Sequence, residues 1–261
     1  MKKNTLNISL AIGIIFIITS CLLYNEYLPG QVCDFFQNPF HRSPKIVSIK
    51  VNPDSVNISF YWKTRGEHIK NISKLKAVLE SQNSKLLFAT NAGMFDKKLS
   101  PIGLFIENGE LIKPLNTKVV KSEEKGSVPN FYLEPNGVLY ITQEEKAGVC
   151  KTTSYSNVSN VKFATQSGPM LVIDGVINKK FHPISHNFYI RNGVGILPNN
   201  ELIFAISINK VTFYDFARYF KEQGCSNALF LDGYVSKAFI PKHGIEQMDG
   251  ELGVLIGITE K

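Results

Sequence analysis

The chain has 261 residues, enough for one large domain or two small ones. Its 44% apolar and 20% charged residues match globular averages and exclude a disordered or fibrous protein. The formal net charge of +7 comes from scattered lysines and arginines, without a run of five or six like charges. We therefore expect no nucleic-acid partner, although a cationic surface attracts anionic substrates or lipids over a long range.

The first 21 residues are typical of an export signal. Lys2 and Lys3 precede the apolar stretch 10–18, which is too short for a membrane helix of about 20 residues. Residues 18–21 resemble a lipobox that ends in Cys21. We expect export to the periplasm or cell envelope; lipidation at Cys21, ordinary cleavage and an uncleaved membrane tether all stay open.

Residues 22–44 hold three prolines and a glycine among polar residues, which indicates a linker. The remaining cysteines, Cys33, Cys150 and Cys225, match no zinc-binding spacing. In an oxidising compartment two of them can pair, and the equal alternative is three unpaired thiols.

Short strands dominate from residue 45 onward. Residues 55–62 alternate between apolar and polar, as a half-buried strand does. Four turns are expected to close hairpins, since Asn-Gly and Asp-Gly favour the positive φ of type I′ turns. They are Asn108-Gly109, Asn136-Gly137, Asp174-Gly175 and 198–200.

Two segments have helical periodicity, 69–82 and 212–223; the second begins with a near capping box and ends before Gly224. The continuous apolar run 228–231 predicts a strand buried on both faces, and 252–258 a final strand. We therefore predict an α+β fold, a single domain over residues 45–261 rich in antiparallel strands and hairpins, with a few packed helices.

Four segments place polar residues and glycine at predicted strand ends, where loops commonly build functional sites. They read Asn91-Ala92-Gly93-Met94-Phe95, Gln166-Ser167-Gly168-Pro169, Arg191-Asn192-Gly193-Val194-Gly195 and Leu231-Asp232-Gly233-Tyr234-Val235-Ser236. Each segment alone also fits an ordinary turn or strand end.

Together, in this order, these segments resemble the motifs of the phosphodiester glycosidase family, and most closely its exported bacterial branch. The resemblance covers about two-thirds of the chain, from residue 86 onward. It implies a hydrolase that cleaves the glycosyl bond of a sugar-1-phosphodiester, such as one carrying N-acetylglucosamine. One departure is that Tyr234 and Val235 stand where the eukaryotic enzyme has two glycines, which implies a different approach for substrate.

Cleaving that bond requires stabilisation of a phosphate leaving group and of an oxocarbenium-like centre. We expect Asp232 to supply the carboxylate, Arg191 to bind phosphate through its planar fork, and Asn91 to complete the catalytic group. Substrate contacts are expected from Gln166, Ser167, Gly168, Asn192, Gly233, Ser236 and His182.

Asn91, Arg191 and Asp232 are expected to converge on one pocket, since strand ends of one sheet can present loops to a common face. Glycosidases usually pair two carboxylates, and Asp96 or Glu107 is the possible second. His186 is a weaker acid–base candidate. No metal or other cofactor is predicted, although a structural Ca²⁺ stays open. The alternative to an enzyme is a non-catalytic glycan-binding or envelope-assembly protein.

Overall fold

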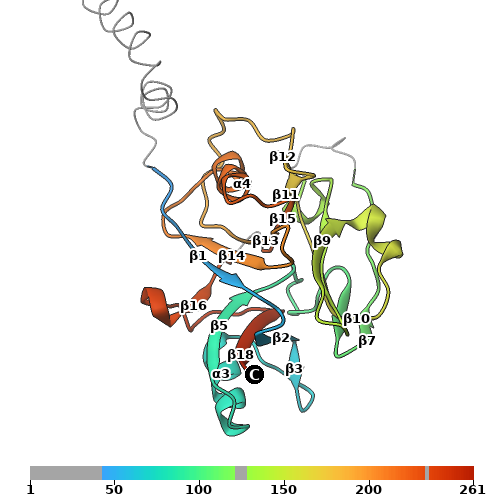
Figure 1. Ribbon diagram of the computed structural model, residues 1–261, viewed down its shortest axis with the longest axis vertical. Helices are drawn as coiled ribbons and strands as arrows, with labels where there is room; N and C mark the ends of the chain where they lie inside the picture. The colour runs from blue at the N-terminus through green and yellow to red at the C-terminus, as the bar shows by residue number, and fades with distance from the viewer. Residues whose placement is uncertain (1–42, 121–127, 233–234) are drawn as a thin grey trace, which may run out of the picture. The chain divides into compact units, whose positions relative to one another are not determined.

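Three antiparallel sheets share one apolar core in the computed structural model, which describes residues 43–120, 128–232 and 235–261 (Figure 1). Residues Pro44–Lys261 form one compact unit. The predicted signal and linker lie outside the described residues except for the last two linker positions. Among the described residues, no helix is long and apolar enough to cross a membrane.

Sheet A has six strands. Their spatial order is β1 (Ile46–Val51), β14 (Leu202–Ser207), β13 (Asn192–Ile196), β15 (Asn227–Phe230), β11 (Met170–Ile173) and β12 (Val176–Ile177). β15 is central, and its apolar residues are buried on both faces as the continuous run predicts.

Sheets B and C have five strands each. Sheet B runs β7 (Glu110–Lys113), β6 (Phe105–Glu107), β10 (Val161–Ser167), β8 (Gly137–Thr142) and β9 (Ala147–Lys151). Sheet C runs β17 (Ile245–Glu246), β16 (Ala238–Ile240), β5 (Leu86–Asn91), β18 (Leu255–Glu260) and β2 (Val56–Tyr61). A small hairpin, β3 (Lys63–Thr64) and β4 (Glu67–His68), follows β2.

The core is built by aromatic side chains that reach from one sheet to the next. Phe60 of sheet C lies 5.5 Å from Phe163 of sheet B between ring centroids. Phe88 of sheet C lies 5.1 Å from Phe204 of sheet A. All four rings are buried, and each contributes about 1.5–3 kcal/mol by leaving water. The strands of all three sheets therefore close around a shared core, with separate apolar clusters under α3 and α4, and the α+β prediction is confirmed.

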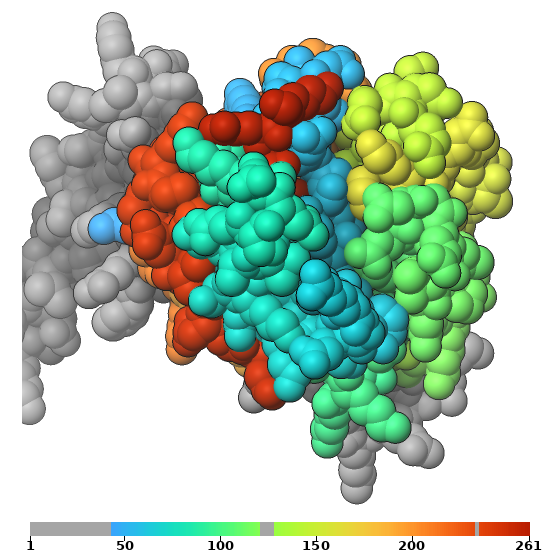
Figure 2. Space-filling view, turned by 90° about the horizontal axis from the view of Figure 1, so that it is seen from below, coloured from blue at the N-terminus to red at the C-terminus, as the bar shows by residue number. Residues whose placement is uncertain are grey.

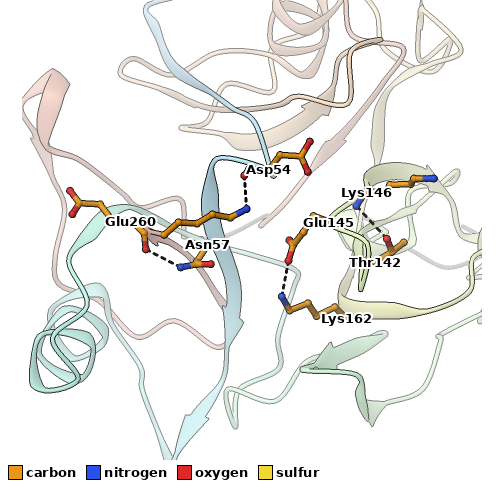
Figure 3. A network of polar contacts seen from close by, with 8 residues as sticks. Asp54, Asn57, Thr142, Glu145, Lys146, Lys162 and Glu260 are labelled. Atoms are coloured by element: carbon orange, nitrogen blue, oxygen red, sulfur yellow. Dashed lines mark hydrogen bonds and ion pairs between the residues drawn. The ribbon is translucent and has the colours of Figure 1, made fainter.

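Polar contacts join strands at the exposed sheet edges (Figure 3). Asn57 Nδ2 of β2 donates to the backbone carbonyl of Glu260 on β18 at 2.9 Å. Lys162 of β10 pairs with Glu145, in the β8–β9 turn, at 3.0 Å. Because both partners of that ion pair are about one-third exposed, it adds at most about 1 kcal/mol.

Helix α3 (Ile72–Ser81) covers sheet C and is capped by Asn71, whose side chain accepts from the Lys74 N–H. Ile72, Leu75 and Leu79 form its buried face. Figure 2 shows α3 in teal, with C-terminal segments in red on one side and sheet B in green and yellow on the other. The helix begins three residues later than predicted, because Asn71 supplies the cap.

Helix α4 (Phe213–Glu222) covers the outer face of sheet A. The predicted capping box forms, with Thr212 accepting from the Asp215 N–H and Asp215 accepting from the Thr212 N–H. Phe216 and Phe220 pack directly on the sheet over Gly193 and Gly195. Neither glycine has a positive φ, so their role is to let the helix approach the strand closely.

The hairpin predictions are correct at three of four turns. Asn108-Gly109 and Asp174-Gly175 have positive φ at both positions and close β6–β7 and β11–β12. Residues 198–200 close β13–β14. Asn136-Gly137 is wrong as a hairpin, because Gly137 starts β8 and its missing side chain leaves room for Met170 Sδ. The last strand also starts at Leu255, three residues later than predicted.

Gly195→Ala should destabilise the domain by about 1–3 kcal/mol, as expected for overpacking. The added Cβ would lie 2.5 Å from Cys225 Sγ and 2.8 Å from Phe220 Cδ1. Urea unfolding measures the loss, and a double-mutant cycle with Cys225→Ala should recover part of it. If the changes in unfolding free energy of the two single variants simply add in the double variant, the contact with Cys225 is not the reason for a glycine at position 195.

Candidate functional site

A buried polar cluster lies where sheets A and C meet. Asn91 ends β5 of sheet C, Asn192 begins β13 of sheet A, and Asp232 follows β15. Asn91 Nδ2 donates to Asp232 Oδ2 at 3.1 Å, although the residues are 141 positions apart. Asp232 is only 4% exposed, so its carboxylate depends on such hydrogen bonds in place of water.

The orientation of the Asn91 amide is fixed by its other contacts. Its Oδ1 accepts from the backbone N–H of Lys237 at 2.8 Å and from Asn192 Nδ2 at 3.2 Å. Only the oxygen of an amide can accept, so the Nδ2 group must face Asp232. Asn91 is therefore locked as a donor toward the carboxylate.

Asn192 and Ser236 support this arrangement from the other side. Asn192 Nδ2 also donates to Thr90 Oγ1 and to the Asn91 carbonyl, each at 2.9 Å. Asn192 Oδ1 accepts from the Ser236 hydroxyl at 3.1 Å. The structure thus brings together four predicted site residues from three separate motifs.

The second motif lies beside the cluster but has its own contacts. Ser167 donates to the backbone carbonyl of Leu231, the residue before Asp232. Gln166 turns away: its Oε1 accepts from the backbone N–H groups of Leu104 and Asn116, and its Nε2 donates to the Asn116 carbonyl. Gly168 packs against Asn136. Gln166 therefore stabilises the neighbouring chain segments at Leu104 and Asn116 and does not point toward Asp232.

Arg191 points to the opposite face of sheet A from Asn192, as the two-residue period of a strand requires. Its Nε donates to the Val211 carbonyl at 3.0 Å, and its Nη2 donates to the backbone carbonyl and Oδ1 of Asn187 at 2.9 and 3.1 Å. The guanidinium carbon lies 3.6 Å from the ring centroid of Phe213. These contacts lie on the α4 side of the sheet. The expected convergence on one pocket is therefore found for Asn91 and Asp232 but not for Arg191.

The charge of Arg191 is only partly compensated. The side chain is 1% exposed, and burial lowers its pKa to about 9, against the raising effects of Tyr189 and Asp215. It therefore remains a cation at neutral pH. Its Nε and Nη2 groups are hydrogen-bonded to backbone and amide oxygens, which offset part of the cost of burying the charge.

His182 lines a cleft of about 420 Å³ next to this arginine. Asn187 and Phe213, which hold the guanidinium, form part of the wall, and Lys180 adds a cation. A smaller cleft of about 240 Å³ also includes Lys180 and Lys151. Glu134 lines both clefts as well, so the cleft residues present cations, hydrogen-bond donors and one carboxylate to a ligand.

The other candidates lie apart from the cluster. Asp96 caps its own turn, accepting from the N–H groups of Lys98 and Ser100. Glu107 lies in the β6–β7 hairpin, where burial and Glu110 raise its pKa to about 7. Exposed His186 does not line the cleft that contains His182.

Gly233, Tyr234 and Cys33 lie outside the described part of the chain. Cys150 and Cys225 are free thiols, so they do not pair with each other. Burial raises the pKa of Cys150 to about 11 and that of Cys225 to about 12, which keeps both protonated and unreactive. No three His, Cys, Asp or Glu side chains gather as metal ligands in the described residues.

Comparison with known proteins identifies the family. The phosphodiester glycosidase model matches residues 84–252, a range that includes every candidate site residue. The uncharacterized protein YigE of Escherichia coli (strain K12) is 36% identical over 213 residues, 81% of this chain and 80% of the relative. The chain belongs to the phosphodiester glycosidase family.

Solved structures show the same fold at low sequence identity. The catalytic domain of zebrafish N-acetylglucosamine-1-phosphodiester alpha-N-acetylglucosaminidase, auto-inhibited by its pro-peptide, is 14% identical, with a TM-score of 0.55 and coverage of 86% of each chain. A hypothetical protein from Synechocystis is 13% identical, with a TM-score of 0.51 over 83% of this chain and 59% of that one. Both likenesses concern the fold alone.

Two residues that hold Asn192 and Arg191 in place were not predicted from the sequence. Thr90 accepts from Asn192 and donates to the Lys237 carbonyl. Its position next to Asn91, at the end of an apolar strand, could have indicated this role. Asn187, which holds Arg191, lies in an irregular loop and gives no comparable signal.

Arg191→Ala should destabilise this domain by about 3 kcal/mol or more, since it removes three hydrogen bonds and leaves a cavity beside Phe213. Arg191→Lys should recover only part, because an ammonium cannot reproduce the fork. Urea unfolding tests both, with exposed Lys180→Ala as a control expected within about 0.5 kcal/mol of the parent. Normal stability of Arg191→Ala would contradict a structural role for the guanidinium.

Proposed function

We propose that this protein hydrolyses the glycosyl bond of a sugar-1-phosphodiester, of the N-acetylglucosamine-1-phosphodiester type, in the cell envelope. Family membership supports the reaction class, and the zebrafish relative carries this activity in its name. The observation that carries the proposal is the buried Asp232 carboxylate held by Asn91. The envelope location rests on the export signal expected from residues 1–21.

In the proposed reaction the bond between the sugar C1 and the phosphate oxygen breaks. The phosphate monoester leaves with the electron pair, and water supplies the new hydroxyl at C1 and loses a proton. Positive charge develops on the sugar ring as the bond lengthens. A carboxylate in a site shielded from bulk water stabilises such charge more strongly than one in water.

Asp232 is our candidate for that carboxylate and for the base that accepts the proton from water. Asn91 acts as a positioning residue, because its amide fixes one carboxylate oxygen and is itself fixed by Lys237 and Asn192. Asn192 and Ser236 would then set the geometry of Asn91 in addition to any contact with sugar hydroxyls.

Arg191 is not assigned to the phosphate, because its guanidinium lies on the face of sheet A opposite to Asn192 and is held there by Val211, Asn187 and Phe213. A phosphate monoester is a good leaving group without full protonation, so one carboxylate can suffice for the reaction. Asp96 and Glu107, which lie in a turn and a hairpin of their own, are then not required.

A non-catalytic glycan-binding or envelope-assembly protein remains the second candidate. It is favoured by one observation: most donors of the predicted site are already hydrogen-bonded within the protein, as in Gln166 and Arg191. Binding alone does not need a buried carboxylate at Asp232, whereas turnover does. Substitution of that charge therefore separates the two candidates.

Asp232→Asn should reduce kcat by at least about 10²-fold and leave KM nearly unchanged, since it keeps the shape and removes the charge. The assay measures sugar released from α-N-acetylglucosaminyl phosphodiesters, with circular dichroism to confirm folding. Asp96→Asn is the matched control, because its amide oxygen can still accept from Lys98 and Ser100. No release by the parent protein, or a folded Asp232→Asn with normal kcat, would favour the binding protein.

A further inference from the structure

The segment after β14 pairs with two other segments near the point where the chain enters the described domain. The N–H of Ile208 donates to the Lys45 carbonyl at 2.7 Å, and the Lys45 N–H donates to Asn209 Oδ1 at 2.7 Å. Tyr189 and Val211 exchange backbone hydrogen bonds of 3.1 and 2.9 Å. We call the surface formed by residues 43–46, 182–190 and 207–211 the junction surface.

Large apolar side chains are unusually exposed on this surface. Ile184 is 76% exposed, Tyr189 57% and Ile208 47%. Single exposed apolar residues need no explanation. Here Tyr189 pairs with the segment that holds Ile208, and Ile184 lies in the loop that leads to Tyr189, so the three belong to adjoining segments of the kind that mark an interaction site. All three lie in loops and not in the regular strands of a sheet.

The charge around the junction surface has one sign. The stretches 43–51, 175–191 and 205–214 contain no Asp or Glu. Their cations are Lys45, Lys50, Lys179, Lys180, Arg191 and Lys210. Three acids adjoin these stretches. Asp174 pairs with Lys151, Asp215 is buried and bound to Thr212, and Glu134 shares a cleft with Lys180.

We propose that the junction surface lies against an anionic lipid bilayer. Exposed apolar side chains surrounded by lysines are the combination that binds an anionic membrane interface. The 42 residues that precede the described domain join it beside Lys45, and their apolar stretch 10–18 is expected to meet the membrane. A tether attached there keeps this surface near the lipid.

This orientation has a consequence for the cleft. One wall of the 420 Å³ cleft belongs to the junction surface and is formed by His182, Ile184, Ser185 and Asn187. The cleft would therefore open beside the bilayer, within reach of ligands carried by lipid. The membrane contact itself does not depend on the proposed reaction.

Added tryptophans can test the contact in the full chain, which contains only one native tryptophan, Trp62. Ile184→Trp places a probe on the junction surface. Leu111→Trp is the matched control, because Leu111 is 58% exposed but lies on β7 in sheet B. Each variant is reconstituted with vesicles of phosphatidylglycerol and brominated phosphatidylcholine, and the parent spectrum is subtracted.

We expect bromine to quench Trp at position 184 at least about twofold more than Trp at position 111. The difference should decrease with vesicles of phosphatidylcholine alone and at about 1 M salt, where the Debye length is about 3 Å. Equal quenching at both positions, or none at 184, would overturn the proposal. Blue-shifted emission from position 184 without vesicles would also overturn it, since protein would then cover the surface.

Discussion

The hydrogen bond between Asn91 and Asp232 joins two sheets that share no strand pairing. β5 belongs to sheet C and β15 to sheet A, so the bond forms only when both sheets have closed on the common core. An unpaired carboxylate at this depth would cost several kcal/mol, and the amide of Asn91 is oriented to prevent that cost. The apolar core and the polar cluster therefore depend on each other. Packing of the core brings Asn91 and Asp232 together, and their hydrogen bond lowers the free-energy cost of burying the carboxylate.

The alternation of strand β13 separates two chemical environments. Asn192 faces the cluster between the sheets, while Arg191, one residue earlier, faces helix α4. Gly193 and Gly195 continue the α4 face and let aromatic rings pack against the strand. The Arg-Asn-Gly-Val-Gly motif thus serves packing and polar contacts at once. A substitution at Arg191 acts on folding, so its effect on activity must be interpreted together with its effect on stability.

Helix ends and turns were predicted correctly from the sequence where one residue type determines the local backbone geometry. The capping box at Thr212 and the turn at Asn108 are of this kind, since each depends on neighbours in sequence. The hairpin predicted at Asn136-Gly137 is wrong, because Gly137 is required by close packing against Met170. That contact forms only in the folded domain, so the local sequence does not indicate it. The contact of Asn91 with Asp232 could be expected from their motifs, but the side of the strand on which Arg191 lies depends on the register of β13, which the sequence does not display.

The central claim is cleavage of the bond at the sugar C1 by a site built around Asp232. Hydrolysis in ¹⁸O-labelled water, followed by rapid reduction of the sugar and mass spectrometry of both products, tests it most directly. The account predicts the label in the released sugar and none in the phosphate monoester, because water attacks C1. Label in the phosphate would show attack at phosphorus and contradict the account.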